Sequence, residues 1–159
     1  LSDGFSDKIM KFIEKCNPDV IQPYRNVMDD SYEATGLKGY VEANNLGVCF
    51  FSPIKHGLLT GKYTEPVYFE MGDFRATINE FANQVVIDKM RTNKEKLEKR
   101  FSNHPQPVMH GVVDALLTDV ETGCVLLGQR NVAQVKAAAQ LGAALTDIDA
   151  DWVKNLYNE

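Results

Sequence analysis

The sequence predicts an α/β fold built on a parallel sheet. Short continuous apolar runs, typical of buried strands, occur at residues 48–51 and 124–127. Segments with apolar side chains at helical spacing lie between and around these runs. The order is helix, strand, helix, strand, long insertion, helix, strand, helix, helix, which favours parallel strands covered by helices on both sides.

The first half of the chain contains two of the expected strands. Its predicted elements are a helix over 7–15, a strand over 19–22, a loop over 26–30, a helix over 36–43 and a strand over 47–51. Asn17-Pro18 ends the first helix, because the residue before a proline avoids the helical region. Asn45 and Gly47 suit the left-handed end of the second.

The second half begins with a long irregular segment over 60–75 that is rich in glycine, proline and aromatic residues, and loops of this length are usually functional or disordered. The elements expected after it are helical structure in two pieces over 78–101, a helix over 106–117, a buried strand over 123–127, and helices over 131–141 and 147–156. The charged part of the helical segment over 78–101, MRTNKEKLEKRF, is expected to be a solvated helix face.

Length and composition fit one globular domain over residues 1–159. The chain is 44% apolar and 25% charged, with a net charge of -5. This charge argues against a nucleic-acid-binding protein, which usually has a basic face. The longest apolar runs are too short to cross a membrane, so neither nucleic acid nor membrane is expected as a partner.

The cysteines and histidines indicate neither disulfides nor a metal site. The odd number of cysteines, without CxxC spacing, predicts reduced and buried thiols in a cytoplasmic protein; they are Cys16, Cys49 and Cys124. The histidines are not at metal-ligand spacing; they are His56, His104 and His110. The opening residues, LSDGFSDKIMKF, look like the middle of an element, which predicts a fragment or a processed product.

The stretch GVCFFSPIKHGLLTGKY, residues 47–63, is the strongest functional signal. It runs from a strand through Ser52-Pro53 into a loop with Gly57 and Gly61 and ends in a lysine. Phosphate oxygens bind backbone N–H groups, hydroxyls and fixed cations, and glycines permit close backbone approach. Such a loop at the end of a strand therefore indicates a ligand, although Ser52-Pro53 could also be only a turn.

Three motifs in order resemble the aldo-keto reductase family. FFSPIKHGLLTGKY is similar to the family's strand-seven loop, DVIQPYRN to its strand six, and VLLGQRNVAQVKAAAQLGAALTDID to its strand eight and following helix. The resemblance covers essentially the whole chain. It implies a partial (β/α)8 TIM-type barrel, about strands 6 to 8 with their helices, and NADP(H) bound across the carboxyl ends of the strands.

The resemblance also implies which residues bind the cofactor. Gln22 falls where a glutamine holds the nicotinamide carboxamide, and Arg25 falls where an aromatic ring stacks on the nicotinamide. Tyr24 would serve instead if the register shifts by one. Residues implied on the phosphate loop and the segment that clasps the cofactor are Ser52, Ile54, His56, Gly57, Leu59, Lys62 and Arg75; Arg130 and Gln134 fall at the adenosine 2'-phosphate end.

Several of these residues also have purely structural interpretations. Gln22 could pair with backbone, Lys55 and His56 could be solvated, and Arg130 could cap a helix or bridge a carboxylate. Ala137 and Ala138 stand where the family has Glu and Asn on the adenine. The family's catalytic Asp, Tyr, Lys and His fall before this chain begins, and no residue here matches them.

Three functional hypotheses follow. The first is the C-terminal half of an NADP-dependent reductase, inactive unless a missing N-terminal half supplies the catalytic residues. The second is a non-catalytic remnant that binds a nucleotide or another anion, or acts as a regulatory partner. The third is a structural unit that associates with itself, because a partial barrel exposes strand edges and an apolar face.

Overall fold

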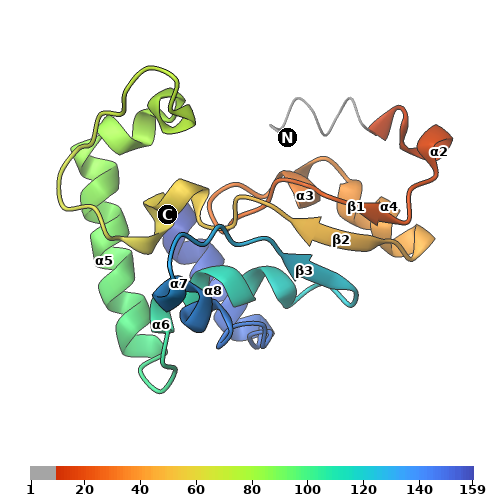
Figure 1. Ribbon diagram of the computed structural model, residues 1–159. Coiled ribbons are helices and arrows are strands. Elements are labelled where there is room, and N and C mark those ends of the chain that lie inside the picture. The colour runs from red at the N-terminus through yellow and green to blue at the C-terminus, as the bar shows by residue number, and fades with distance from the viewer. Residues whose placement is uncertain (1–9) are drawn as a thin grey trace.

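The computed structural model describes residues 10–159 and contains a parallel sheet. Its strands are β1 (Val20–Ile21), β2 (Gly47–Phe50) and β3 (Gly123–Val125), in the spatial order β1-β2-β3. Both neighbouring pairs are parallel, and a further bridge joins Tyr24 to Phe51 beyond the ends of β1 and β2. Figure 1 shows the strands side by side. The predicted parallel α/β class is confirmed, with each strand shorter than expected.

Helices pack against one face of this small sheet and extend beyond its carboxyl ends. They are α2 (Ile13–Cys16), α3 (Ser31–Ala34), α4 (Leu37–Asn44), α5 (Gln84–Arg100), α6 (Pro107–Met109), α7 (Val132–Ala138) and α8 (Asp147–Asn158). Shorter 3₁₀ turns lie at Lys55–Thr60, Phe74–Thr77, Asn79–Ala82 and Ala115–Leu117, and a π-helical turn covers His110–Asp114.

The predicted helices differ from these mainly in detail. The segment 78–101 does form two pieces, a 3₁₀ turn followed by α5, and the segment 106–117 is helical but changes type from α to π to 3₁₀. The short helix α3, which Asp30 caps by accepting a hydrogen bond from the Glu33 amide, was not predicted. The predicted helix over 7–15 lies partly outside the described residues.

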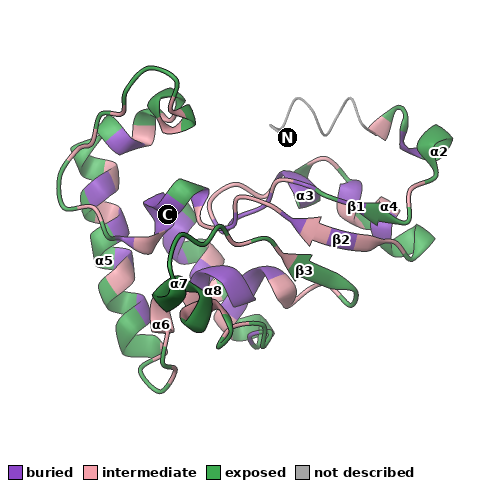
Figure 2. Cartoon of the chain, in the orientation of Figure 1, coloured by how far each residue is buried: buried purple, intermediate pink, exposed green. Residues whose placement is uncertain are grey.

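The sheet is buried on one face, contrary to the prediction of strands buried on both. Along β2, Val48 and Phe50 are buried whereas Gly47 and Cys49 are only half-buried. Figure 2 shows β3 largely in the exposed colour. The buried face packs with the helices into one apolar core. The other face is open, because Val20, Cys124 and Leu126 are exposed on it.

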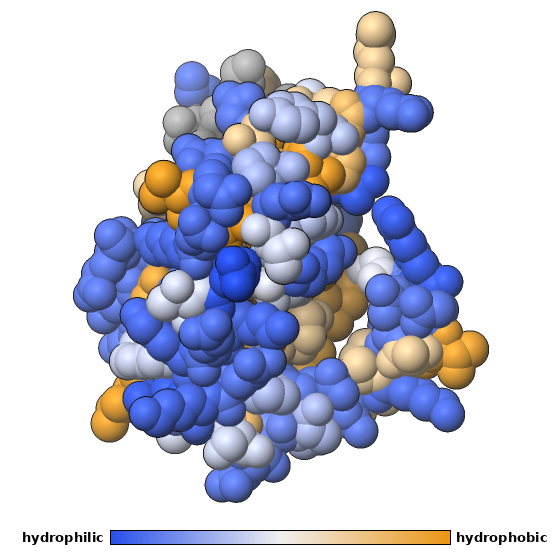
Figure 3. Space-filling model, turned by 90° about the vertical axis from the view of Figure 1, so that its left-hand side faces the viewer, coloured by the Kyte–Doolittle hydropathy of each residue, from blue (hydrophilic) through white to orange (hydrophobic). Residues whose placement is uncertain are grey.

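Helix α5 is amphipathic. Its inner face includes Ile87, Met90 and Leu97, each at most 1% exposed. Its outer side belongs to the mostly hydrophilic surface seen in Figure 3, as predicted for the charged segment. No helix within residues 10–159 is long and apolar enough to cross a membrane.

Candidate functional site

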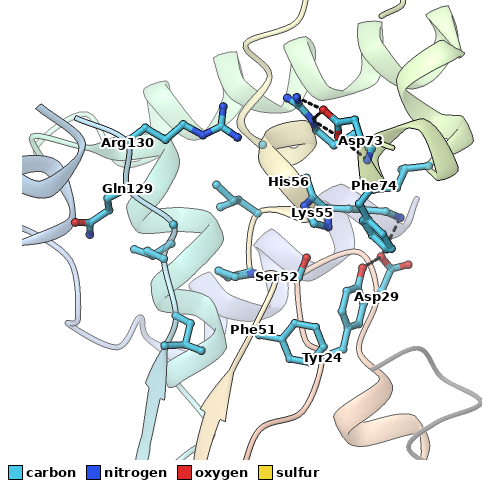
Figure 4. A pocket seen from close by; sticks show the side chains of 18 of the residues that line it. Tyr24, Asp29, Phe51, Ser52, Lys55, His56, Asp73, Phe74, Gln129 and Arg130 are labelled. Carbon is cyan, nitrogen blue, oxygen red and sulfur yellow. Dashed lines mark hydrogen bonds and ion pairs between the residues drawn. The ribbon is translucent and has the colours of Figure 1, made fainter. Parts of the chain in front are cut away.

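A cavity of about 1160 Å³ lies where the strands end. Ser52 follows β2, Leu126 follows β3 and Tyr24 follows the β1 segment, and all three line it. The carboxyl ends of parallel strands are where ligands bind in barrels and other α/β folds. Figure 4 shows the side chains that converge here.

Most of the predicted cofactor-binding residues line this cavity. They are Ser52, Ile54, His56, Gly57, Lys62, Arg75, Arg130 and Gln134. They come from three separate segments: the loop after β2, the segment before α5, and the β3–α7 connection. The structure therefore brings together residues that the motifs placed far apart in the chain.

The loop after β2 has an unusual backbone. Positive φ angles occur at Ser52 (61°), Lys55 (44°), His56 (55°), Gly57 (93°) and Gly61 (62°). Left-handed backbone is costly for residues with a Cβ and is commonly kept at ligand-binding sites. A Cβ on Gly57 would lie 3.0 Å from the Lys62 Nζ, so the glycine lets that ammonium group rest against the loop.

Ser52 has a hydroxyl without a partner. Its Oγ is buried, and within residues 10–159 no hydrogen-bond partner for it is found. Burial of a polar atom without a hydrogen bond costs free energy, so such atoms are uncommon and are found at functional sites. Because Ser52 lines the cavity, its hydroxyl is available to a ligand there.

Two cations at the cavity also lack carboxylate partners. Lys62 and Arg130 are exposed, and neither forms an ion pair with any residue in the described part of the chain. Figure 4 shows the Arg130 side chain reaching along the cavity toward Asp73. Free positive charge beside a polar loop favours an anionic ligand.

Arg75, by contrast, is already paired. Its Nε donates to Asp73 at 3.0 Å, and its guanidinium lies 4.1 Å from the centroid of the Phe69 ring. The Arg75 hydrogen bonds hold the pKa of the Asp73 carboxyl at about 2. These contacts order the segment before α5 internally, and Asp73 and Arg75 both line the cavity.

A second polar network lies deeper in the cavity. The Tyr24 hydroxyl donates to Asp29 at 3.0 Å, and Lys55 Nζ lies 2.9 Å from Asp29 and 2.7 Å from Glu80. Burial opposes the charge of Lys55, but hydrogen bonds to Glu80 and Asp29 outweigh it and raise the pKa. Burial, then Asp29, raise the pKa of Tyr24 to about 12. Lys55 is therefore buried and paired, not solvated as one interpretation of the sequence expected.

His56 packs on an aromatic ring at the same cavity. Its imidazole lies 5.1 Å from Phe74 between ring centroids. Partial desolvation of this otherwise exposed ring, helped by the positive charge of Arg75, lowers the pKa of His56 below its ordinary 6.5 and favours the neutral imidazole at pH 7. His56 can therefore donate or accept a hydrogen bond but adds no charge.

Three predicted residues do not reach the cavity. Gln22 is exposed and is not part of the lining. Leu59 is 0% exposed and belongs to the apolar core. Arg25 is also 0% exposed, and it points away from the cavity to pair with Asp30 and Asp119. Because neighbouring residues in extended chain point to opposite sides, Tyr24 lines the cavity in its place.

Several lining residues were not among the predicted site residues. They include Asp29, Lys55, Asp73 and Phe74, together with apolar positions after β2 and β3. The only local signal was Asp73, whose side chain accepts a hydrogen bond from the Arg75 amide as a helix cap does. Asp29 and Lys55 meet through tertiary contacts that no local pattern reports.

The connection into α7 is held by its own side chains. Asn131 Oδ1 accepts from the Gln134 amide at 3.0 Å, as the predicted asparagine cap requires, and Gln134 Oε1 accepts from the Arg130 amide at 2.6 Å. These bonds hold Arg130 and Gln134, which both line the cavity, at the start of α7. No group of three or more metal-ligating side chains occurs among the described residues.

The chain belongs to the aldo-keto reductase family, because the model of the Aldo/keto reductase family matches residues 3–157. Enzymes of this family generally use nicotinamide cofactors. A search of the curated proteins finds no significant match.

Solved structures give the same fold. A glycerol dehydrogenase, AKR11B4 from Gluconobacter oxydans, matches with a TM-score of 0.76 and 25% identity over 94% of this chain and 45% of its own. The holo form of aldo-keto reductase AKR11C1 from Bacillus halodurans matches with a TM-score of 0.58 and 18% identity, over 95% of this chain and 46% of its own. The chain thus spans less than half the length of these relatives.

Proposed function

We propose that this chain is the C-terminal, cofactor-binding half of an NADP-dependent aldo-keto reductase, a cytoplasmic enzyme that reduces aldehydes or ketones by hydride transfer. The observation that carries the proposal is the meeting of three polar groups at one cavity. The Lys62 ammonium and the Arg130 guanidinium form no ion pair within residues 10–159, and the buried Ser52 hydroxyl has no hydrogen-bond partner there. Membership of the family supports the class of enzyme.

The cavity residues fit a dinucleotide. Lys62 and Arg130 offer charged donors for phosphate, and the loop from Ser52 to Gly57 offers a hydroxyl and closely approachable backbone. The Tyr24 ring, edge-on to Phe51 at 5.5 Å, offers an aromatic surface for the nicotinamide. When bound, the cofactor supplies or accepts the hydride. The volume of about 1160 Å³ exceeds that of pockets for drug-sized ligands.

Arg130 supports a preference for NADP over NAD. Its guanidinium is exposed and forms no ion pair in the described part of the chain, which suits the extra 2'-phosphate through bidentate hydrogen bonds. Ala137 and Ala138 can make no polar contact with the adenine. The 2'-phosphate, rather than the base, would therefore supply the discrimination at this end of the cofactor.

The catalytic groups would come from elsewhere. The relatives have more than half of their length outside the match, and no residue of this chain matches the family's catalytic Asp, Tyr, Lys and His. We place the chain at about strands 6 to 8 of the barrel, as a single domain over 1–159. It should bind cofactor yet be inactive until an N-terminal half completes the barrel.

Titration with NADPH, and with NADH in parallel, tests this proposal. The chain should bind NADPH saturably, and Lys62→Ala and Arg130→Ala should each weaken binding by about tenfold, as loss of one charge-assisted hydrogen bond implies. Lys96→Ala removes an exposed cation of α5 that does not line the cavity and should change nothing. If all three variants weakened NADPH binding equally, the loss of affinity would come from the change in net charge alone. That result would contradict the assigned site.

The second candidate is a non-catalytic remnant that binds a nucleotide or another anion, or associates with itself. The open sheet face favours self-association, because Val20 is 61% exposed and Leu126 47% exposed there. Sedimentation of the purified chain distinguishes the cases. A stable dimer that binds no NADPH would favour the remnant, whereas a monomer that binds NADPH would favour the reductase half.

A further inference from the structure

Cys49 and Cys124 lie opposite each other on neighbouring strands. They are register partners in the parallel pair β2–β3, and their Sγ atoms are 3.2 Å apart. Both are free thiols. Neighbouring strands are about 4.8 Å apart, which lies within the Cα separation of disulfides. The two sulfur atoms therefore need little backbone movement to bond.

Both thiols are on the open face of the sheet. Val48 and Phe50, which flank Cys49 on β2, point into the core, so the Cys49 side chain points to the other face. Cys124 is exposed and Cys49 is half-buried. Figure 1 shows β2 and β3 adjacent, and Figure 2 shows the exposure of β3. A reagent in solution can thus reach Cys124 first.

We propose that Cys49 and Cys124 form an oxidisable dithiol that closes to a disulfide on reaction with a low-molecular-weight disulfide of the glutathione type. The Cys124 thiolate attacks one sulfur of the oxidant, forming a mixed disulfide and releasing one glutathione thiol. The Cys49 thiolate then attacks the Cys124 sulfur and releases the second glutathione thiol. Two protein thiols lose two electrons and two protons, and one glutathione disulfide is reduced.

This dithiol adjoins the cavity but is distinct from the cofactor-binding groups. Phe51 and Leu126, which line the cavity, are two residues further along each strand and so lie on the same face. A disulfide would fix the spacing of β2 and β3 directly below these residues. The inference rests on the strand register and thiol contact alone, so it stands or falls independently of the proposed function.

The test uses the whole chain carrying Cys16→Ser, which removes an exposed third thiol that lies outside the pair. The reduced protein is incubated with glutathione disulfide and its intact mass is measured without reductant. We expect a product lighter than the reduced chain by two hydrogen atoms, and peptide mapping should link residues 49 and 124. Closure should be at least about tenfold faster than addition of a second glutathione, because the thiols are held in contact.

Single-thiol variants give the control. Cys49→Ser and Cys49→Ala, in the same background, should stop at one stable glutathione adduct on Cys124, while circular dichroism shows that the fold is kept. The closed form should also melt at a higher temperature than the reduced form, because the cross-link restricts the unfolded chain. Accumulation of two glutathione adducts per chain, or of disulfide-linked dimers, would overturn the proposal.

Discussion

Arg25 pairs with Asp119 through two hydrogen bonds of 2.8 and 2.9 Å, across 94 positions of sequence. The same guanidinium contacts Asp30 and the carbonyl of Leu116. Its carbon lies 4.9 Å from the centre of the Phe50 ring in the core. A single buried side chain thus joins the segment after β1 to the segment before β3.

Removal of Arg25 should strongly destabilise the chain. Arg25→Ala leaves Asp30 and Asp119 without their buried partner, which should lower the free energy of unfolding by about 3–5 kcal/mol in urea denaturation. Arg100→Ala is the matched control, because Arg100 pairs with Asp149 near the surface at 2.7 Å. It should cost about 1 kcal/mol or less. Similar losses in the two variants would mean that Arg25 is not a structural link.

Asp119 should make the chain sensitive to acid. Burial disfavours its charge, but the hydrogen bonds and charge of Arg25 outweigh burial and hold the pKa of the carboxyl well below its ordinary 3.8. Its contribution to the free energy of unfolding is complete above pH 3.8 and is lost as the pH falls through the lowered pKa.

Asp119→Asn should therefore lower stability at pH 7 and reduce the further loss of stability below about pH 4. Urea denaturation of both proteins at a series of pH values measures the difference. Asp149→Asn removes a more exposed carboxylate whose pKa is also lowered, and it should reduce the pH dependence of the free energy of unfolding less than Asp119→Asn does. Parallel curves for wild type and Asp119→Asn would show that this carboxyl does not titrate as described.

The sequence predicted the parts of the fold that depend on local patterns. The order of helices and strands along the chain, the helical structure within 78–101 and the asparagine cap of α7 follow from apolar periodicity and cap residues. The short helix α3 was missed because four residues carry too little periodicity. The open sheet face was missed because apolar runs look the same whether one face or both are covered.

The residues that line the cavity could be predicted where a sequence motif supplied them. They could not be predicted where a long-range ion pair determines the position of the side chain. Ser52, Lys62 and Arg130 reach the cavity as the family resemblance implied. Arg25 does not reach the cavity, because it forms a buried ion pair with Asp119 of a distant segment. Lys55 is buried for a related reason, since Glu80 and Asp29 neutralise it. Long-range ion pairs have no signature in local sequence.

Ser52→Ala should separate binding from stability. Removal of a buried hydroxyl that lacks a partner should leave the free energy of unfolding unchanged or raise it by about 1 kcal/mol. If the hydroxyl binds the cofactor, the same change should weaken NADPH binding by about tenfold. Thermal denaturation and fluorescence titration measure the two effects. Lower stability together with unchanged binding would show that the hydroxyl has a structural partner and no ligand.

Gly61 should tolerate substitution least among the residues of the loop after β2. An added Cβ would lie 2.5 Å from the Met90 carbonyl oxygen on α5, and the φ of 62° is already unfavourable for other residues. Gly61→Ala should therefore push the loop away from α5 and lower the free energy of unfolding by more than about 2 kcal/mol.

Gly36→Ala is the matched control for Gly61→Ala. Its φ is 77°, but an added Cβ would meet nothing within 4 Å. This variant should cost only about 1 kcal/mol, from backbone strain alone. Urea denaturation gives both values, and the difference between them measures the steric clash with α5. Equal losses of free energy of unfolding in the two variants would mean that the loop over 57–62 can shift away from α5 without cost. This part of the cavity lining would then not be rigid.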